Sequence, residues 1–248
     1  MFRAVRDSSA KAGALFHGYR LQRTARLFIF ELLVVIVGVL IAQGLANLVG
    51  DRATQRQVSE EHSRLDFELG RSRQTSEAWR VAIPCLRKRV DALMDASESG
   101  RSPLLERDIA MPGGGYYMVE PISSDIARPF RDRYGADRSD IYFLANETSH
   151  RIADNIYEAR QEWAKFGLLS LGPGRLNEID KSQLRAAGIR VRWLLKTIDS
   201  QAGAMDELGR QLGIAPIASD NAIEILGTPV SNCDEIWRNN SIYHVVRG

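Results

Sequence analysis

A run of 23 residues near the N-terminus, Leu27 to Val49, constrains the fold more than any other feature of the sequence. It has one ionisable side chain, Glu31, and no further charge follows before Asp51. As an α-helix the run would be about 34 Å long, enough to cross a hydrocarbon core of about 30 Å. The core helix of a soluble protein would offer a polar face to water, and this run has none. It is therefore predicted to span a membrane.

A cleaved signal peptide is the competing interpretation of the same run. Signal peptides carry an apolar region of about 7–15 residues that ends in small residues, and Gly44 to Ala46 would fit such an ending. The run here is longer, begins only after a tail of 26 residues, and contains an acid. We therefore favour an uncleaved anchor.

The formal net charge of +2 is unevenly distributed along the chain. Residues 1–26 carry six basic side chains and one acid, whereas residues 51–248 carry 27 basic and 29 acidic ones. Basic residues flanking a span stay on the cytoplasmic side and attract anionic lipid headgroups. The prediction is a cytoplasmic tail over 1–26, a span over 27–49 and an exported domain over 50–248, which would be periplasmic in a Gram-negative-type inner membrane.

One face of the predicted span carries small residues and its single acid. On a helical wheel, Gly38, Ala42 and Ala46 form a ladder that permits close helix approach, and Glu31 shares that face. This face is predicted to associate with a second copy or with another membrane protein. Two interpretations of Glu31 stay open. It could mark an interface between helices or an ion site, or its side chain could reach the lipid headgroups and pair with a nearby Arg.

The span also resembles a known group of proteins. The features that match are an acidic residue at Glu31, an aliphatic run, the sequence Gly38 to Ala42 (GVLIA), and polar residues at the exit, Gln43 and Asn47. With these features the span is similar to the opening of an uncharacterised family of bacterial single-span membrane proteins. That family usually has Trp after the Asn or Asp, where this chain has Leu48. The resemblance covers about 25 residues. It implies a topology and no activity.

The region after the span is predicted to be mainly helical. Inward positions between 58 and 93 step by three and four, which indicates a helix leaving the membrane, and Pro84 predicts a break in it. Residues 100–135 are rich in Pro and Gly and predict an irregular insertion, with a connecting loop at Gly113 to Gly115 and one short strand at 116–119. Helices are expected from Ser139 to about 166 and from about 177 to 212, closed by Gly213. Together these make a bundle of three to four helices.

The two cysteines, Cys85 and Cys233, are the whole thiol content of the chain. An even pair in an oxidising compartment predicts a disulfide, with two unpaired buried thiols as the alternative. The bond would fix the C-terminal region to the first exported helix.

The residues offer little catalytic chemistry. No two of the four His have metal-ligand spacing, and no catalytic, metal or cofactor motif is present, so none is assigned. Ser170 misses the spacing of a nucleophile elbow by one residue. A cluster of basic residues interleaved with Asp has two interpretations, an anion site and local salt bridges. Its members are Arg128, Arg131, Arg133 and Arg138.

These observations favour a single-pass periplasmic interaction or sensing module without evident catalysis. A periplasmic small-ligand binder or enzyme that uses His150 and the Arg cluster is an alternative, as is an accessory subunit of a membrane complex with Glu31 against a partner helix. An exported domain with a net charge of −2 argues against nucleic-acid binding.

Overall fold

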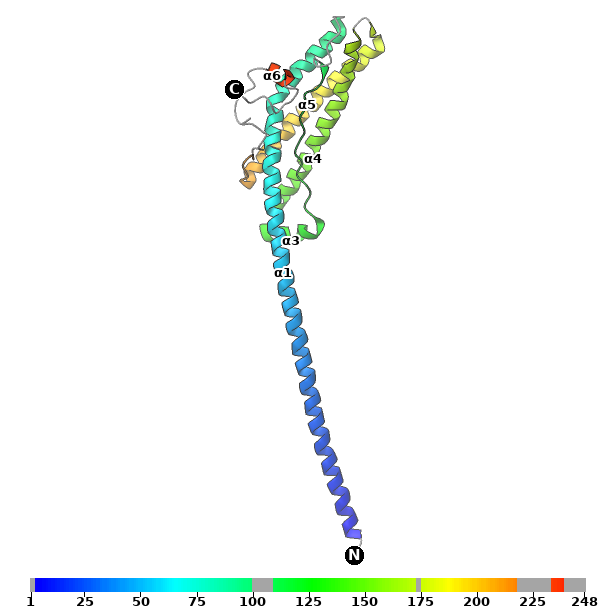
Figure 1. Ribbon diagram of the computed structural model, residues 1–248, viewed down its shortest axis with the longest axis vertical. Helices are drawn as coiled ribbons and strands as arrows, with labels where there is room; N and C mark the ends of the chain where they lie inside the picture. Colours follow the sequence, from blue (N-terminus) through cyan, green and yellow to red (C-terminus); the bar gives the residue numbers. More distant parts are fainter. Residues whose placement is uncertain (1–2, 100–108, 173–174, 218–232, 239–248) are drawn as a thin grey trace. The chain divides into compact units, whose positions relative to one another are not determined.

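The computed structural model describes residues 3–99, 109–172, 175–217 and 233–238, and of residues 3–27 it describes the backbone. The chain divides into two units, 1–56 and 57–248. Helix α1, Arg3–Ser99, begins in the first unit and ends in the second. The described part of the chain is mainly helical and contains no strand, as Figure 1 shows.

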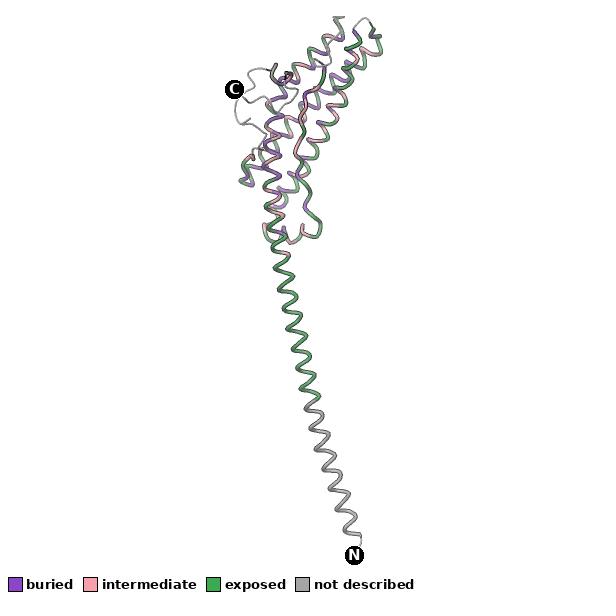
Figure 2. The backbone as a smooth tube through the Cα atoms, in the orientation of Figure 1, coloured by how far each residue is buried: buried purple, intermediate pink, exposed green. Residues whose placement is uncertain are grey.

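The first unit consists of the N-terminal part of α1. Every residue from 28 to 50 is exposed, including fifteen large apolar side chains such as Phe28, Phe30 and Leu40 (Figure 2). This segment is long and apolar enough to cross a membrane. The prediction of one apolar helix near the N-terminus is confirmed. The side chains of the predicted basic tail, residues 1–26, lie outside the described residues.

In the second unit, α1 buries one face. The positions predicted from the three-and-four spacing are indeed inward, and they include two serines at the middle of the stripe. The buried apolar members are Val58, Leu65, Leu69, Trp79, Ile83, Leu86, Val90 and Leu93, and the serines are Ser72 and Ser76.

The break predicted at Pro84 is wrong, because Pro84 lies inside α1 and the helix continues to Ser99. Proline removes one backbone hydrogen bond and bends a helix. Here the residues on both sides, Ile83 and Leu86, are buried in the same core, so packing holds the helix together across the missing bond.

The region predicted to be irregular over 100–135 contains a helix, α3, Ser124–Tyr134. Phe130 anchors α3 because its ring is fully buried. Gly135, at φ 86°, separates α3 from α4, Ala136–Ala164. The expected N-cap Ser139 is therefore wrong, and Ser139 instead lies buried in the first turns of α4, where its hydroxyl donates to the Gly135 carbonyl oxygen.

After α4 a 3-10 helix, η1, Lys165–Leu171, takes the place of the predicted turn. Helix α5, Glu178–Leu212, matches its predicted bounds closely. Its ends explain why: Asn177 forms a capping box with Asp180, and Gly213 adopts a left-handed φ of 74°. Helix α6, Cys233–Arg238, lies in the region expected to be irregular.

The strand predicted at residues 116–119 is wrong, because the chain there has no regular secondary structure. The segment 111–123 instead runs beside α1 and α4 (Figure 1). Side chains from both helices bind its backbone. The Trp79 indole N–H donates to the Gly115 carbonyl at 3.2 Å, and the Val119 N–H donates to the Ser149 hydroxyl at 3.0 Å. One apolar core joins this segment to α1, α4 and α5.

Candidate functional site

The predicted helix-association face lies on the exposed part of α1. Glu31, Gly38, Ala42 and Ala46 are all solvent-exposed. A Cβ placed on Gly38 would meet nothing within 4 Å. Within the described part of the first unit, no other segment covers this face, so it is sterically free to receive a second helix.

The two cysteines are brought together. Cys85 in α1 and Cys233 in α6 lie at disulfide distance, with their Cα atoms 5.5 Å apart, which is typical of a disulfide. Around them α6 packs on the core: Ile236 is fully buried, and the Trp237 ring lies 5.2 Å from the Arg89 guanidinium and 6.2 Å from the Trp163 ring.

The four arginines of the predicted anion cluster do not act as one group. Arg128 and Arg131 are exposed, the first 4.0 Å from Asp132 and the second 3.0 Å from Asp140. Arg133 stacks over the Tyr134 ring at 5.6 Å. These contacts are the local ones that an interleaved sequence of Arg and Asp would form.

Arg138 differs from the other three because it is partly buried. Its Nη2 donates to the Leu212 carbonyl at 3.5 Å, and its buried Nε has no hydrogen-bond partner among the described residues. It belongs to a histidine cluster that we define as His62, Asp66, Tyr134, Arg138 and Tyr142.

The histidine cluster joins three helices. From α1, the His62 ring stacks on the Tyr134 ring of α3 at 4.2 Å. The His62 Nε2 is 3.3 Å from the Tyr142 hydroxyl of α4, and that hydroxyl donates to the Asp66 carboxylate. The His62 Nδ1 lies 3.4 Å from the same carboxylate.

Burial sets the ionisation of the histidine cluster. Burial lowers the pKa of His62, the Asp66 carboxylate acts in the opposite direction, and Arg138 and Arg133 lower it further. Burial and the hydrogen bond to Asp66 raise the pKa of Tyr142 above its usual range. The cluster therefore favours a neutral imidazole at His62.

No local pattern in the sequence marks this cluster. His62 and Tyr142 are 80 residues apart, and no local spacing connects them. The one available signal was a His in the inward-facing stripe of α1, at a position where an apolar residue is the usual choice.

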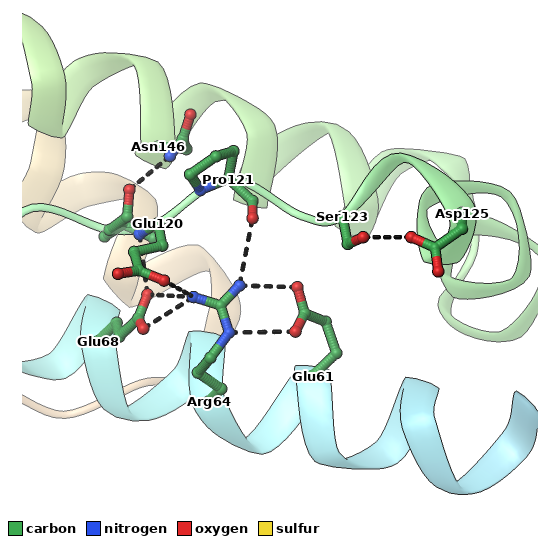
Figure 3. A network of polar contacts seen from close by, with 9 residues as sticks. Glu61, Arg64, Glu68, Glu120, Pro121, Ser123, Asp125 and Asn146 are labelled. Atoms are coloured by element: carbon green, nitrogen blue, oxygen red, sulfur yellow. Dashed lines mark hydrogen bonds and ion pairs between the residues drawn. The ribbon is translucent and has the colours of Figure 1, made fainter. Parts of the chain in front are cut away.

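A second polar network holds the segment 111–123 against α1. Figure 3 shows Arg64 between Glu61 and Glu68, with bonds of 2.7–3.1 Å to their carboxylates. The same guanidinium donates to the Pro121 carbonyl at 3.3 Å, and Glu68 accepts the Glu120 N–H at 2.9 Å. Hydrogen bonding to Glu61 raises the pKa of Arg64, so the guanidinium stays charged.

The remaining sequence candidates do not converge on a single site. His150 is exposed on α4, twelve residues beyond Arg138 and so roughly 18 Å along the helix axis. The Ser170 hydroxyl donates to the Gly167 carbonyl at 2.7 Å, as expected for a helix end. Among the described residues, no group of three His, Cys, Asp or Glu could hold a metal ion.

Comparison of the chain with protein-family models, with curated proteins and with solved structures finds no match in any of the three.

Proposed function

We infer that this chain is a single-pass inner-membrane protein whose exported domain is a periplasmic interaction or sensing module, built as a bundle of three to four helices. The observation that carries the proposal is the exposure of every residue from 28 to 50. An apolar helix this long is unfavourable in water at about 25 cal/mol per Å2 of apolar surface, and a bilayer removes that cost. The resemblance of the span to a family of bacterial single-span proteins supports the same topology.

Association of the span is the proposed mode of action within the membrane. Gly38, Ala42 and Ala46 give a surface without protruding side chains, which lets a second backbone approach closely. A homo-oligomer is the first candidate, and a polytopic partner that receives Glu31 is the second. In both, the exported domain would report on, or respond to, the state of the complex.

A membrane two-hybrid assay with matched glycine variants tests this role. Gly38→Ile adds bulk on the proposed face, whereas Gly44→Ile adds the same bulk about 120° away around the helix, and a Cβ at either position meets nothing within 4 Å. Self-association should fall in Gly38→Ile and persist in Gly44→Ile. Equal self-association signals from both variants would show that this face is not the helix–helix interface.

Cross-linking separates the two partners. A photoreactive residue at position 31 should give a dimer band if the chain pairs with itself, and a heavier adduct with another membrane protein if it is an accessory subunit. Adducts to lipid alone would assign Glu31 to the headgroup layer and contradict both associations.

A further inference from the structure

A cavity of about 450 Å3 opens at the junction of α4 and η1, away from the histidine cluster. Trp163 and Ile109 are buried and form its floor, and the Trp163 indole N–H donates to the Ile109 carbonyl at 2.6 Å. Ala164, Gly167 and Ser170 form an exposed rim. The volume lies within the range of sites that hold small molecules, about 300–1,000 Å3.

One charged side chain, Arg160, is among the residues that line the cavity. Its Nη2 donates to the Gly114 carbonyl, which orients the guanidinium. Within the described residues, Arg160 forms no ion pair with a carboxylate. A guanidinium has five N–H donors, so most of them remain to bind a ligand.

Arg160 differs in this from Arg151 of the same helix and from Arg190 of the neighbouring helix. Arg151 pairs with Glu147 within α4, and Arg190 of α5 binds Glu158. Their charges are neutralised locally, whereas Arg160 lines a cavity that also has buried apolar side chains in its lining. Partial desolvation there strengthens the attraction for an anion relative to the same contact in water.

We propose that this cavity binds a small amphipathic carboxylate, with the carboxylate on Arg160 and the apolar chain over Trp163 and Ile109. A neutral oxygen would accept a weaker hydrogen bond from Arg160 than a carboxylate does, and a cation would be repelled. The site is contained in the second unit and does not depend on the topology inferred for the span.

Binding can be measured by calorimetry on the full chain in nanodiscs of uncharged lipid, with empty nanodiscs as reference. Octanoate should bind saturably, while octanol should bind more weakly and octyltrimethylammonium should give no heat above the reference. Arg160→Gln should weaken octanoate binding roughly 10- to 100-fold, the loss expected for a charge-assisted contact. Arg151→Gln, at an exposed paired position, should leave it unchanged.

A second pair of variants tests the cavity itself. A Cβ at Gly167 would meet nothing within 4 Å, so Gly167→Leu fills the cavity without a clash and should abolish octanoate binding. Gly203→Leu in α5 is the control, also with open space around the Cβ, and should bind like the parent. The proposal is overturned if octanoate gives no heat above empty nanodiscs, if octyltrimethylammonium binds equally well, or if Arg160→Gln and Gly167→Leu both bind like the parent.

Discussion

Loss of the link between α1 and α6 should lower the stability of the folded domain more than any other single change discussed below. Cys85 and Cys233 are separated by 148 residues. In the chain-entropy model, a bond closing a loop of that length stabilises the folded state by about 5 kcal/mol. For a domain of 150–250 residues, each kcal/mol corresponds to about 2–4 °C in Tm, so Cys85→Ser should lower Tm by roughly 10–20 °C.

Thermal unfolding of the full chain in mild detergent, followed by tryptophan fluorescence, measures this loss. Cys233→Ser should match Cys85→Ser, and the double variant should cost no more than either single one, since both remove the same bond. A reductant should lower the Tm of the parent protein to that of the variants and leave the Tm of the variants unchanged. The reasoning fails if the parent and Cys85→Ser unfold together and two thiols titrate in the native parent.

Three further predictions concern the interior of the second unit. Because the pKa of His62 is lowered on folding, the unfolded chain binds the proton first, so the free energy of unfolding should fall as pH drops below about 6.5. Denaturant titrations from pH 7.5 to 5 measure this slope. His62→Gln should reduce the slope, and the control His150→Gln should leave it as in the parent. The Tyr116 hydroxyl lies 2.9 Å from the Ser72 hydroxyl and 2.7 Å from the Ser76 hydroxyl, and burial raises the pKa of Tyr116 to about 12. Tyr116→Phe removes these hydrogen bonds and should lower the free energy of unfolding in urea by about 1–2 kcal/mol. An unchanged free energy of unfolding would show that the serine hydroxyls find other partners. Gly203→Ala should stabilise α5 by up to about 1 kcal/mol, because a Cβ there meets nothing within 4 Å. Gly188→Ala should stabilise less or destabilise, because its methyl group would overlap the Met94 side chain. Equal gains in Tm for the two variants would contradict this packing.

Local sequence signals predicted the elements that local interactions determine. The bounds of α5 follow from an Asn177 cap and a Gly213 stop, and the inward face of α1 follows from its three-and-four spacing. The cysteine pairing could be predicted because the chain has two cysteines and they can form a single intramolecular pair. The exposed apolar segment 28–50 was the strongest signal, since the described residues contain one candidate membrane span and it begins there.

The errors arise where tertiary packing overrides local preference. Pro84 lies within a helix because Ile83 and Leu86 on either side of it are buried in one core. Pro129 likewise lies inside α3, where the burial of Phe130 outweighs the missing hydrogen bond. The strand expected at 116–119 did not form, because side chains of α1 and α4, rather than another strand, supply partners for that backbone.

The polar sites were inaccessible to sequence reasoning for a different reason. Each joins residues that are distant along the chain: His62 with Tyr142, and Arg64 with Pro121. The arginine cluster was visible in sequence as a group, yet only Arg138 points into the interior. Nothing near Arg160 in the sequence marks it as the cation that lines the cavity.

Paired reporter fusions test the central claim most directly. Alkaline phosphatase folds actively after export and green fluorescent protein fluoresces when retained in the cytoplasm, so each is fused in turn after Gly248 of the full chain. The account predicts an active phosphatase fusion, a dark fluorescent fusion, and a chain that stays in the membrane fraction through alkaline carbonate extraction. A fluorescent C-terminal fusion with inactive phosphatase, or release of the chain by carbonate, would contradict it.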